Sequence, residues 1–252
     1  MMNICLQCGH HFNGKFCPNC GQAATVKRLS ATVLLEEILH FFTHLENGFV
    51  YTTWNFLIRP GKSAMEFIAG KRKNYQKPVS YFLIWVGLYI VLHNSIINFY
   101  DYRMGQEVLQ GLSIKEQSNV FFRQHLSLFI IPVILVSALW LYIFLARPRF
   151  NFVELLAICM YGTGTYFMMS LFSDLVIGVV FRNNILTLNV FFWQAILSSC
   201  YNLWFSYDVF KRLHLRFFWL RLISVSLLVA VSGWLIMIYF PVLWIDINEL
   251  LH

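Results

Sequence analysis

Five long apolar segments follow one another along the chain from residue 79 onward. A transmembrane helix needs about 20 predominantly apolar residues to cross the hydrocarbon core of a bilayer. Segments of that length occur at Val79–Phe99, Leu126–Ala146, Val153–Val180, Ile185–Phe205 and Phe217–Phe240. The pattern therefore predicts an all-α integral membrane bundle of about five transmembrane helices.

Two of these segments depart from a plain apolar helix. The third is long and contains Gly162 and Gly164, which predict tilt or a kink. The fourth is the most polar of the five. It carries Asn189, Gln194, Ser198, Ser199 and Asn202.

The overall composition supports a membrane protein. Hydrophobic residues make up 58% of the 252 residues and charged residues only 12%, where a soluble domain carries about 25%. Aromatic residues, at 18%, are also abundant, as expected for lipid-facing and interfacial positions. This composition excludes an ordinary soluble enzyme or binding domain.

The positive charges predict the orientation. Most of the 19 Lys and Arg residues precede the first span or lie in the 147–152 and 206–216 connections. The opposite side holds only Arg103, Lys115, Arg123 and Arg182. The positive-inside rule then predicts a cytosolic N-terminus and an outside C-terminus, in the cytoplasmic (inner) membrane of a cell. The net charge of +7 follows from this asymmetry, so we expect no nucleic-acid partner.

Ahead of the spans the chain divides into two parts. Residues 1–22 form a cysteine-rich module, 23–77 hold amphipathic or interfacial helices with a basic end, and 78–252 form the transmembrane domain. Apolar residues from Ser30 to Leu45 repeat on one face of a helix. A second apolar stretch covers Phe49–Ile58. Two placements remain open for these helices, in the membrane interface or packed under the bundle.

Four cysteines in two CxxC pairs mark the N-terminal module. Cys5 and Cys8 precede Gly9, and Cys17 and Cys20 precede Gly21. Two such pairs supply the four thiolates of a tetrahedral Zn²⁺ site, and the glycine after each pair permits a left-handed turn. A site with four protein ligands leaves no open position for catalysis. The spacing predicts a structural zinc ribbon, with iron in the same cage as the alternative.

The first eighty residues resemble a bacterial membrane family called domain of unknown function 3667. The residues that carry the resemblance are the second knuckle Cys17–Gln22, Thr52, Arg59-Pro60-Gly61, Gly70–Tyr75 and Pro78. The resemblance implies a zinc-ribbon head on an integral membrane body. The family has no established activity, so the resemblance implies none for this chain.

Three other groups of residues are candidate sites. Glu37, His40 and His44 share one face of the first amphipathic helix and form a candidate second metal site, or simply its polar face. A cluster beside the first span is a candidate site for anionic lipid headgroups, or a topological anchor. It consists of Arg59, Lys71, Arg72, Lys73, Tyr75 and Lys77.

Asp174 is the single carboxylate well inside a predicted span. Intramembrane ionisable residues are functional candidates by default. Asp174 and Gln194 of the next span form a candidate intramembrane polar site, for which interhelical hydrogen bonding is the alternative. Tyr161, Thr163, Thr165, Ser170, Ser173 and Asn189 join them as candidate cavity-lining residues.

Three functions follow from these features, and we rank them by the number of features that support each. The first is a scaffold or adaptor that interacts with lipid and binds a cytosolic protein through its zinc ribbon. The second is a transporter or channel that uses the polar residues of spans three and four. A lipid-modifying enzyme ranks last, because the sequence shows no nucleophile–base arrangement, phosphate loop or repeated histidine motif.

Overall fold

The computed structural model describes most of the chain. It covers residues 3–26, 28–31, 48–104, 126–146, 149–180, 188–213 and 215–251. All but the first two residues of the expected helix Ser30–Leu45 lie outside the described residues, and with them Glu37, His40 and His44.

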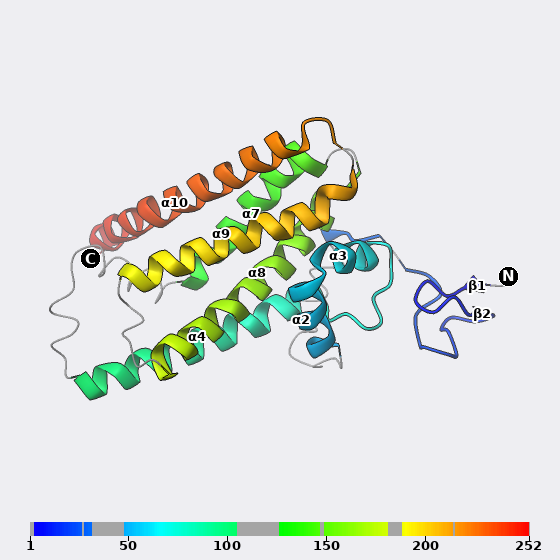
Figure 1. Ribbon diagram of the computed structural model, residues 1–252, viewed down its shortest axis with the longest axis horizontal. Coiled ribbons are helices and arrows are strands. Elements are labelled where there is room, and N and C mark those ends of the chain that lie inside the picture. Colours follow the sequence, from blue (N-terminus) through cyan, green and yellow to red (C-terminus); the bar gives the residue numbers. More distant parts are fainter. Residues whose placement is uncertain are drawn as a thin grey trace.

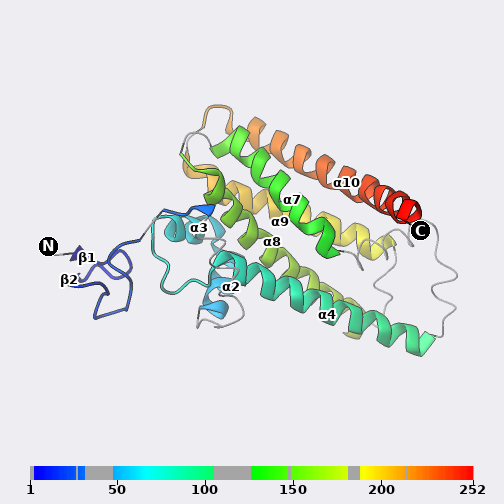
Figure 2. The same ribbon diagram turned by 180° about the vertical axis from the view of Figure 1, so that it is seen from behind.

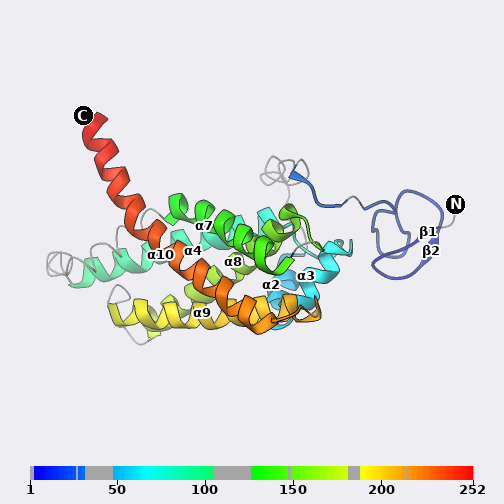
Figure 3. The ribbon, with the colours of Figure 1, turned by 90° about the horizontal axis from the view of Figure 1, so that it is seen from above.

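Long helices lying side by side form the body of the molecule (Figure 1). They are α4 (Pro78–Met104), α7 (Leu126–Leu141), α8 (Phe152–Leu175), α9 (Leu188–Phe210) and α10 (Phe218–Leu251). The last turns of two helices widen into π-helix, at Tyr142–Ala146 after α7 and at Val176–Val180 after α8. Figure 3 shows α10 running obliquely to its neighbours, with its C-terminal half leaving the bundle.

Among the described residues, three helices are long and apolar enough to cross a membrane, over Pro78–Ile96, Phe129–Ala146 and Phe152–Gly178. They coincide with the first three predicted spans. The fourth and fifth segments are also helical, in α9 and α10. Within α10 the structure describes the apolar stretch Phe218–Gly233. The total of five spans therefore stays a prediction.

The contact between α4 and α8 is the central seam of the bundle. A Cβ placed on Gly164 would lie 2.8 Å from the ring of Tyr81, so only glycine allows the two helices this approach. A Cβ on Gly162 would likewise lie 3.2 Å from the ring of Phe205 of α9. Both glycines therefore serve close packing within the continuous helix α8, and the tilt or kink that they predict stays a prediction.

Two short helices, α2 (Phe49–Ile58) and α3 (Pro60–Ile68), pack against one end of the bundle (Figure 1). Phe56 of α2 is fully buried and stacks on Tyr161 of α8, with the ring centroids 4.1 Å apart. On the other face of α2, Val50 and Trp54 are 78% and 60% exposed. One face of α2 therefore packs on the bundle and the other presents apolar side chains outward, while its placement in the membrane interface stays a prediction.

The N-terminal module stands beyond the same end of the bundle, away from the C-terminus (Figure 2). Its regular structure is minimal. Strands β1 (Asn3–Ile4) and β2 (His11–Phe12) pair in antiparallel fashion, and Phe16 pairs with Ala23. The module's own core consists of Cys5, Phe12 and Cys17, which is too little apolar surface to fold a segment of this size without a further cross-link.

Candidate metal centre and buried polar sites

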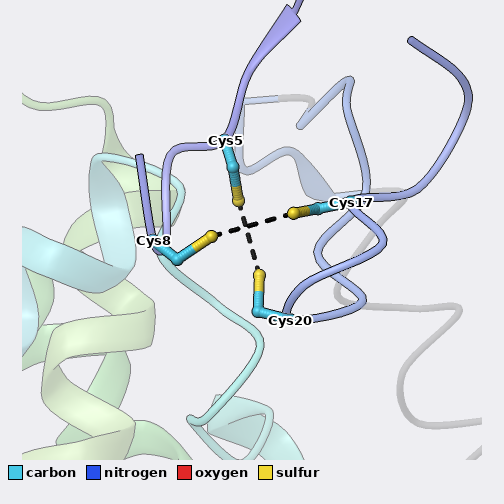
Figure 4. A group of neighbouring side chains, drawn as sticks. All are labelled: Cys5, Cys8, Cys17 and Cys20. Atoms are coloured by element: carbon cyan, nitrogen blue, oxygen red, sulfur yellow. Dashed lines mark hydrogen bonds between the residues drawn. The ribbon is translucent and has the colours of Figure 1, made fainter. Parts of the chain in front are cut away.

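The four cysteine sulfurs converge on one point in the N-terminal module (Figure 4). All four Sγ atoms lie within 4.8 Å of one another, with Cys5–Cys20 at 3.4 Å and Cys8–Cys17 at 3.7 Å. Zn–S bonds of about 2.3 Å in a tetrahedron place the sulfurs about 3.8 Å apart. The cage thus has the size and the donor set of a four-thiolate metal site.

Two equivalent turns build this cage. In the first, the amide of Gly9 donates to the carbonyl of Cys5, and in the second the amide of Gly21 donates to the carbonyl of Cys17, at 2.9 and 2.8 Å. The two glycines have φ angles of 75° and 74°, in the left-handed region where a side chain adds strain. The glycine after each CxxC therefore turns the second cysteine back toward the first.

The protein environment makes the thiols unequal. The pKa of Cys8 is lowered to about 6, chiefly by a hydrogen bond from the backbone of His10. The pKa of Cys20 is raised to about 12. The backbone of Gln22 lowers this pKa, but desolvation and the three neighbouring sulfurs outweigh that effect. Four adjacent thiolates repel one another, and a bound divalent cation would offset that repulsion.

The module rests on the loop between α3 and α4. The amide of Lys73 donates to Oε1 of Gln22 at 3.0 Å, and the aliphatic end of Lys73 lies against Gly21. Leu6, from the first CxxC turn, sits 3.0 Å from the position a Cβ would take on Gly70. Gly70 also has a φ of +99°, so two independent constraints require glycine there.

A second attachment ties the segment after the module to α8. Arg28 donates two hydrogen bonds to the carboxylate of Glu154, at 2.7 and 3.0 Å. Nδ2 of the Asn151 side chain donates to the carbonyl of Leu29 at 3.1 Å, and Asn151 and Glu154 also form the capping box of α8. The hydrogen bond to Glu154, together with its charge, raises the pKa of Arg28.

The Arg59-Pro60-Gly61 motif joins α3 to α9. Pro60 occupies the first position of α3, and the amide of Gly61 donates to Oδ2 of Asp208 at 2.6 Å. A Cβ on Gly61 would lie 2.1 Å from the carbonyl oxygen of Asp208. Asp208 also pairs with Lys211 at 2.5 Å. The motif therefore fixes two elements that are far apart in sequence.

The predicted headgroup cluster separates into surface cations and one core residue. Arg59 and Lys73 are exposed, while Lys71 and Lys77 are half-buried. Lys71 pairs with Glu66 at 3.7 Å. Arg72, also half-buried, lies over the ring of Phe67 at 5.2 Å.

Tyr75 has a different environment from the cations around it. Its side chain is buried, and its hydroxyl donates to Glu66 at 2.9 Å. Burial raises its pKa, and so does Glu66. Tyr75 therefore packs the base of the loop, and we leave it out of the surface set considered below.

Asp174 and Gln194 come together, with a third residue that the sequence did not indicate. Nδ1 of His93 and Oδ2 of Asp174 are 2.6 Å apart, and Nε2 of Gln194 donates to Oδ1 of Asp174 at 2.5 Å. All three side chains are at most 8% exposed and come from α4, α8 and α9. The sequence could have indicated His93 through its position along the first span. Spans one and three cross the membrane in the same direction, so His93 and Asp174 lie at a similar depth in it.

The other polar residues expected around Asp174 serve separate purposes. Tyr161 donates to the carbonyl of Gln76 at 2.5 Å, and Thr165 pairs with Tyr81 at 2.9 Å. Ser170 and Ser173 line a small pocket beside Gln194. Thr163 lines a different cavity, described below, and the side chain of Asn189 lies outside the described residues.

Comparison with known proteins gives one match, to a family model that covers a single segment of the chain. Residues 46–90 match the sequence model of a family described as Protein of unknown function (DUF3667), which confirms the resemblance for α2, α3 and the first half of α4. No curated protein and no solved structure matches the chain. The matched segment contains Gly61 and Gly70, whose contacts bring α9 and the cysteine module together with it.

Proposed function

We propose that this chain is a membrane scaffold whose zinc-stabilised head is fixed against a basic loop that binds anionic lipid headgroups. Its proposed place is the cytoplasmic membrane, with the head in the cytosol. The observation that carries the proposal is the seating of the cysteine module on residues 70–77, through Leu6 on Gly70 and Gln22 on Lys73. The cysteine module, the loop and α4, which begins at the end of that loop, are thereby connected.

Zn²⁺ is the metal that the donor set favours, held by Cys5, Cys8, Cys17 and Cys20. Four thiolates in a tetrahedral cage suit zinc, and iron would take the same cage. The bound metal would supply the cross-link that the three-residue core of the module lacks. A closed set of four protein ligands supports a structural role.

The cations of the loop support the headgroup role. Lys73 is exposed and Lys71 and Arg72 are partly exposed, all in the loop that leads from α3 to α4, and Arg59, between α2 and α3, is exposed as well. Each basic residue near an anionic membrane surface contributes about 1 kcal/mol of attraction. The module, for its part, presents Ile4 and Phe16 at 62% and 66% exposure, and these side chains suit a protein partner.

The headgroup role is tested by lipid retention. Lys73→Gln is compared with Lys15→Gln, which removes the same charge from an exposed site in the cysteine module. Each protein is reconstituted in nanodiscs of phosphatidylcholine and phosphatidylglycerol, and the enrichment of phosphatidylglycerol around it is measured. We expect a loss of about fivefold per charge in the first variant only. Equal losses in the two variants, with the N-terminus on the same side of the membrane, would contradict the role.

Proton-coupled transport is the second candidate, and the His93–Asp174–Gln194 group favours it. A buried imidazole–carboxylate pair between three helices is the type of group that relays protons in membrane transporters. Asp174→Asn keeps the shape of the site and removes its charge. If the group carries protons, proteoliposomes containing the wild type dissipate a pH gradient faster than those containing the variant. Identical rates would leave the group with a packing role.

A further inference from the structure

A cavity of about 460 Å³ lies between the four helices α7, α8, α9 and α10. It lies in the half of the bundle nearer the cysteine module, since it includes the Gly162–Phe205 contact. Every one of the four helices contributes a hydroxyl or amide to its lining. These polar residues are Ser137, Thr163, Ser199, Asn202, Ser206 and Ser226.

The polar residues that α9 contributes to the cavity lie on one face of the helix. Ser199, Asn202 and Ser206 follow one another at intervals of three and four residues, which places them on one helix face. That face is turned to the cavity. It is separate from the position of Gln194, which bonds to Asp174. The cavity is therefore independent of the buried ionisable group and of the cysteine module.

The hydroxyls favour a ligand that donates a hydrogen bond. Ser137 donates to the carbonyl of Val133 at 2.7 Å, and Ser226 donates to the carbonyl of Leu222 at 2.9 Å. Once a serine hydroxyl has donated to its own helix, its oxygen remains an acceptor. Asn202 adds an amide, which both donates and accepts. A ligand hydroxyl satisfies this arrangement.

The same lining disfavours a charged head. None of the described residues that line the cavity carries a charge, and most of the lining is apolar. Burying a phosphate there without a counter-ion would cost several kcal/mol. At the rim, Leu203, Ile223 and Leu227 are 39%, 53% and 61% exposed, so an alkyl chain leaving the cavity meets apolar surface.

We propose that this cavity binds a neutral lipid alcohol, with its hydroxyl among the serines and Asn202 and its chains extending past the apolar rim. The volume falls in the range of about 300–1,000 Å³ that ligand pockets occupy, and a few placed polar groups in an apolar wall are typical of such pockets. Its ligand differs from that of the basic loop, for which we propose anionic lipid headgroups.

The test is photo-cross-linking in nanodiscs of phosphatidylcholine. The probe is 1,2-dioleoylglycerol with a diazirine in one acyl chain, and adducts are located by mass spectrometry. We expect adducts on the α9 and α10 segments 199–206 and 223–230, with competition by unlabelled dioleoylglycerol and none by phosphatidylglycerol. Competition by both lipids to the same degree would overturn the proposal, because it would show a surface for any acyl chain.

Three variants complete the test. Asn202→Leu removes the amide at nearly constant volume, and Ala230→Phe fills the cavity. We expect three- to tenfold weaker labelling in the first, as for the loss of one or two hydrogen bonds, and at least tenfold in the second. Ser224→Ala is the control, because its hydroxyl bonds to Leu220 on the same helix outside the cavity. Labelling that stays unchanged in Asn202→Leu and Ala230→Phe, in protein that remains monodisperse, would also overturn the proposal.

Discussion

Single glycines determine how closely the elements of this protein approach one another. Gly61, Gly70 and Gly164 each lie where a Cβ would meet another part of the chain at 3.0 Å or less. By contrast, a Cβ on Gly87 of α4 would meet nothing within 4 Å. The fold gives the reason why Gly61, Gly70 and Gly164 must be glycine and shows that Gly87 need not be.

Replacing Gly61 by Ala should destabilise the protein. The new Cβ would lie 2.1 Å from the carbonyl oxygen of Asp208, so α3 must move away from α9 and lose the 2.6 Å hydrogen bond. Overpacking of this kind costs about 2 kcal/mol or more. Gly87→Ala is the control and should be neutral or slightly stabilising, since it adds a better helix former in open space. The measurement is the melting temperature of detergent-purified protein by size exclusion after heating.

At the scale of elements, buried polar side chains hold the helices together. His93, Asp174 and Gln194 join α4, α8 and α9, and Tyr81 and Thr165 join α4 and α8 a few turns away. In the hydrocarbon core of a bilayer such groups cannot form hydrogen bonds with water instead. Their contacts with one another therefore fix the relative positions of the helices. Each contact also shows where a polar residue of a predicted span is used.

Removing one member of the buried pair should be worse than removing both. His93→Leu leaves the Asp174 carboxylate without its imidazole partner, and breaking a buried pair in this way costs about 3–5 kcal/mol. The double variant His93→Leu/Asp174→Leu removes the charge as well and should recover part of the loss. Thermal stability of the two variants in the same detergent checks this. A double variant that is less stable than the single one would show that the pair does not act as a unit.

The attachment of the linker to α8 gives a third prediction. Arg28→Lys keeps the charge and loses the two-pronged geometry toward Glu154, and Arg28→Gln loses both. Hydrogen exchange of the segment 28–31 should therefore rise in both variants, and more in Arg28→Gln. The melting temperature of the helical body should change little, because Arg28 is largely exposed. Unchanged exchange in Arg28→Gln would show that Leu29 and Asn151 hold the linker without the ion pair.

The sequence predicts local features of this protein well and long-range ones poorly. The CxxC spacing predicts that Cys5, Cys8, Cys17 and Cys20 lie together, because each pair of cysteines is close in sequence and can reach the same point. The first three spans follow from apolar length alone. The partnership of His93 with Asp174 and that of Gly61 with Asp208 depend on how distant segments pack, and hydropathy carries no such information. The burial of Tyr75 was missed for the same reason.

Across the whole molecule, the cysteine module, the basic loop and the helical bundle are in contact with one another. The module contacts the loop through Gln22 and Leu6, and the linker contacts α8 through Arg28. The matched family segment 46–90 lies at the centre of these contacts. A change in the cysteine module should therefore alter the loop ahead of α4, where Gly70 and Lys73 contact the module.

The metal content of the chain tests whether the N-terminal head is a zinc module that holds the basic loop. Detergent-purified wild type and Cys5→Ser/Cys8→Ser are analysed by plasma mass spectrometry, alongside hydrogen exchange of residues 70–77. We expect one zinc per wild-type chain, none in the variant, and faster exchange of the loop once the metal is lost. A wild-type chain without bound metal, or a variant that keeps its zinc and its loop protection, would contradict this expectation.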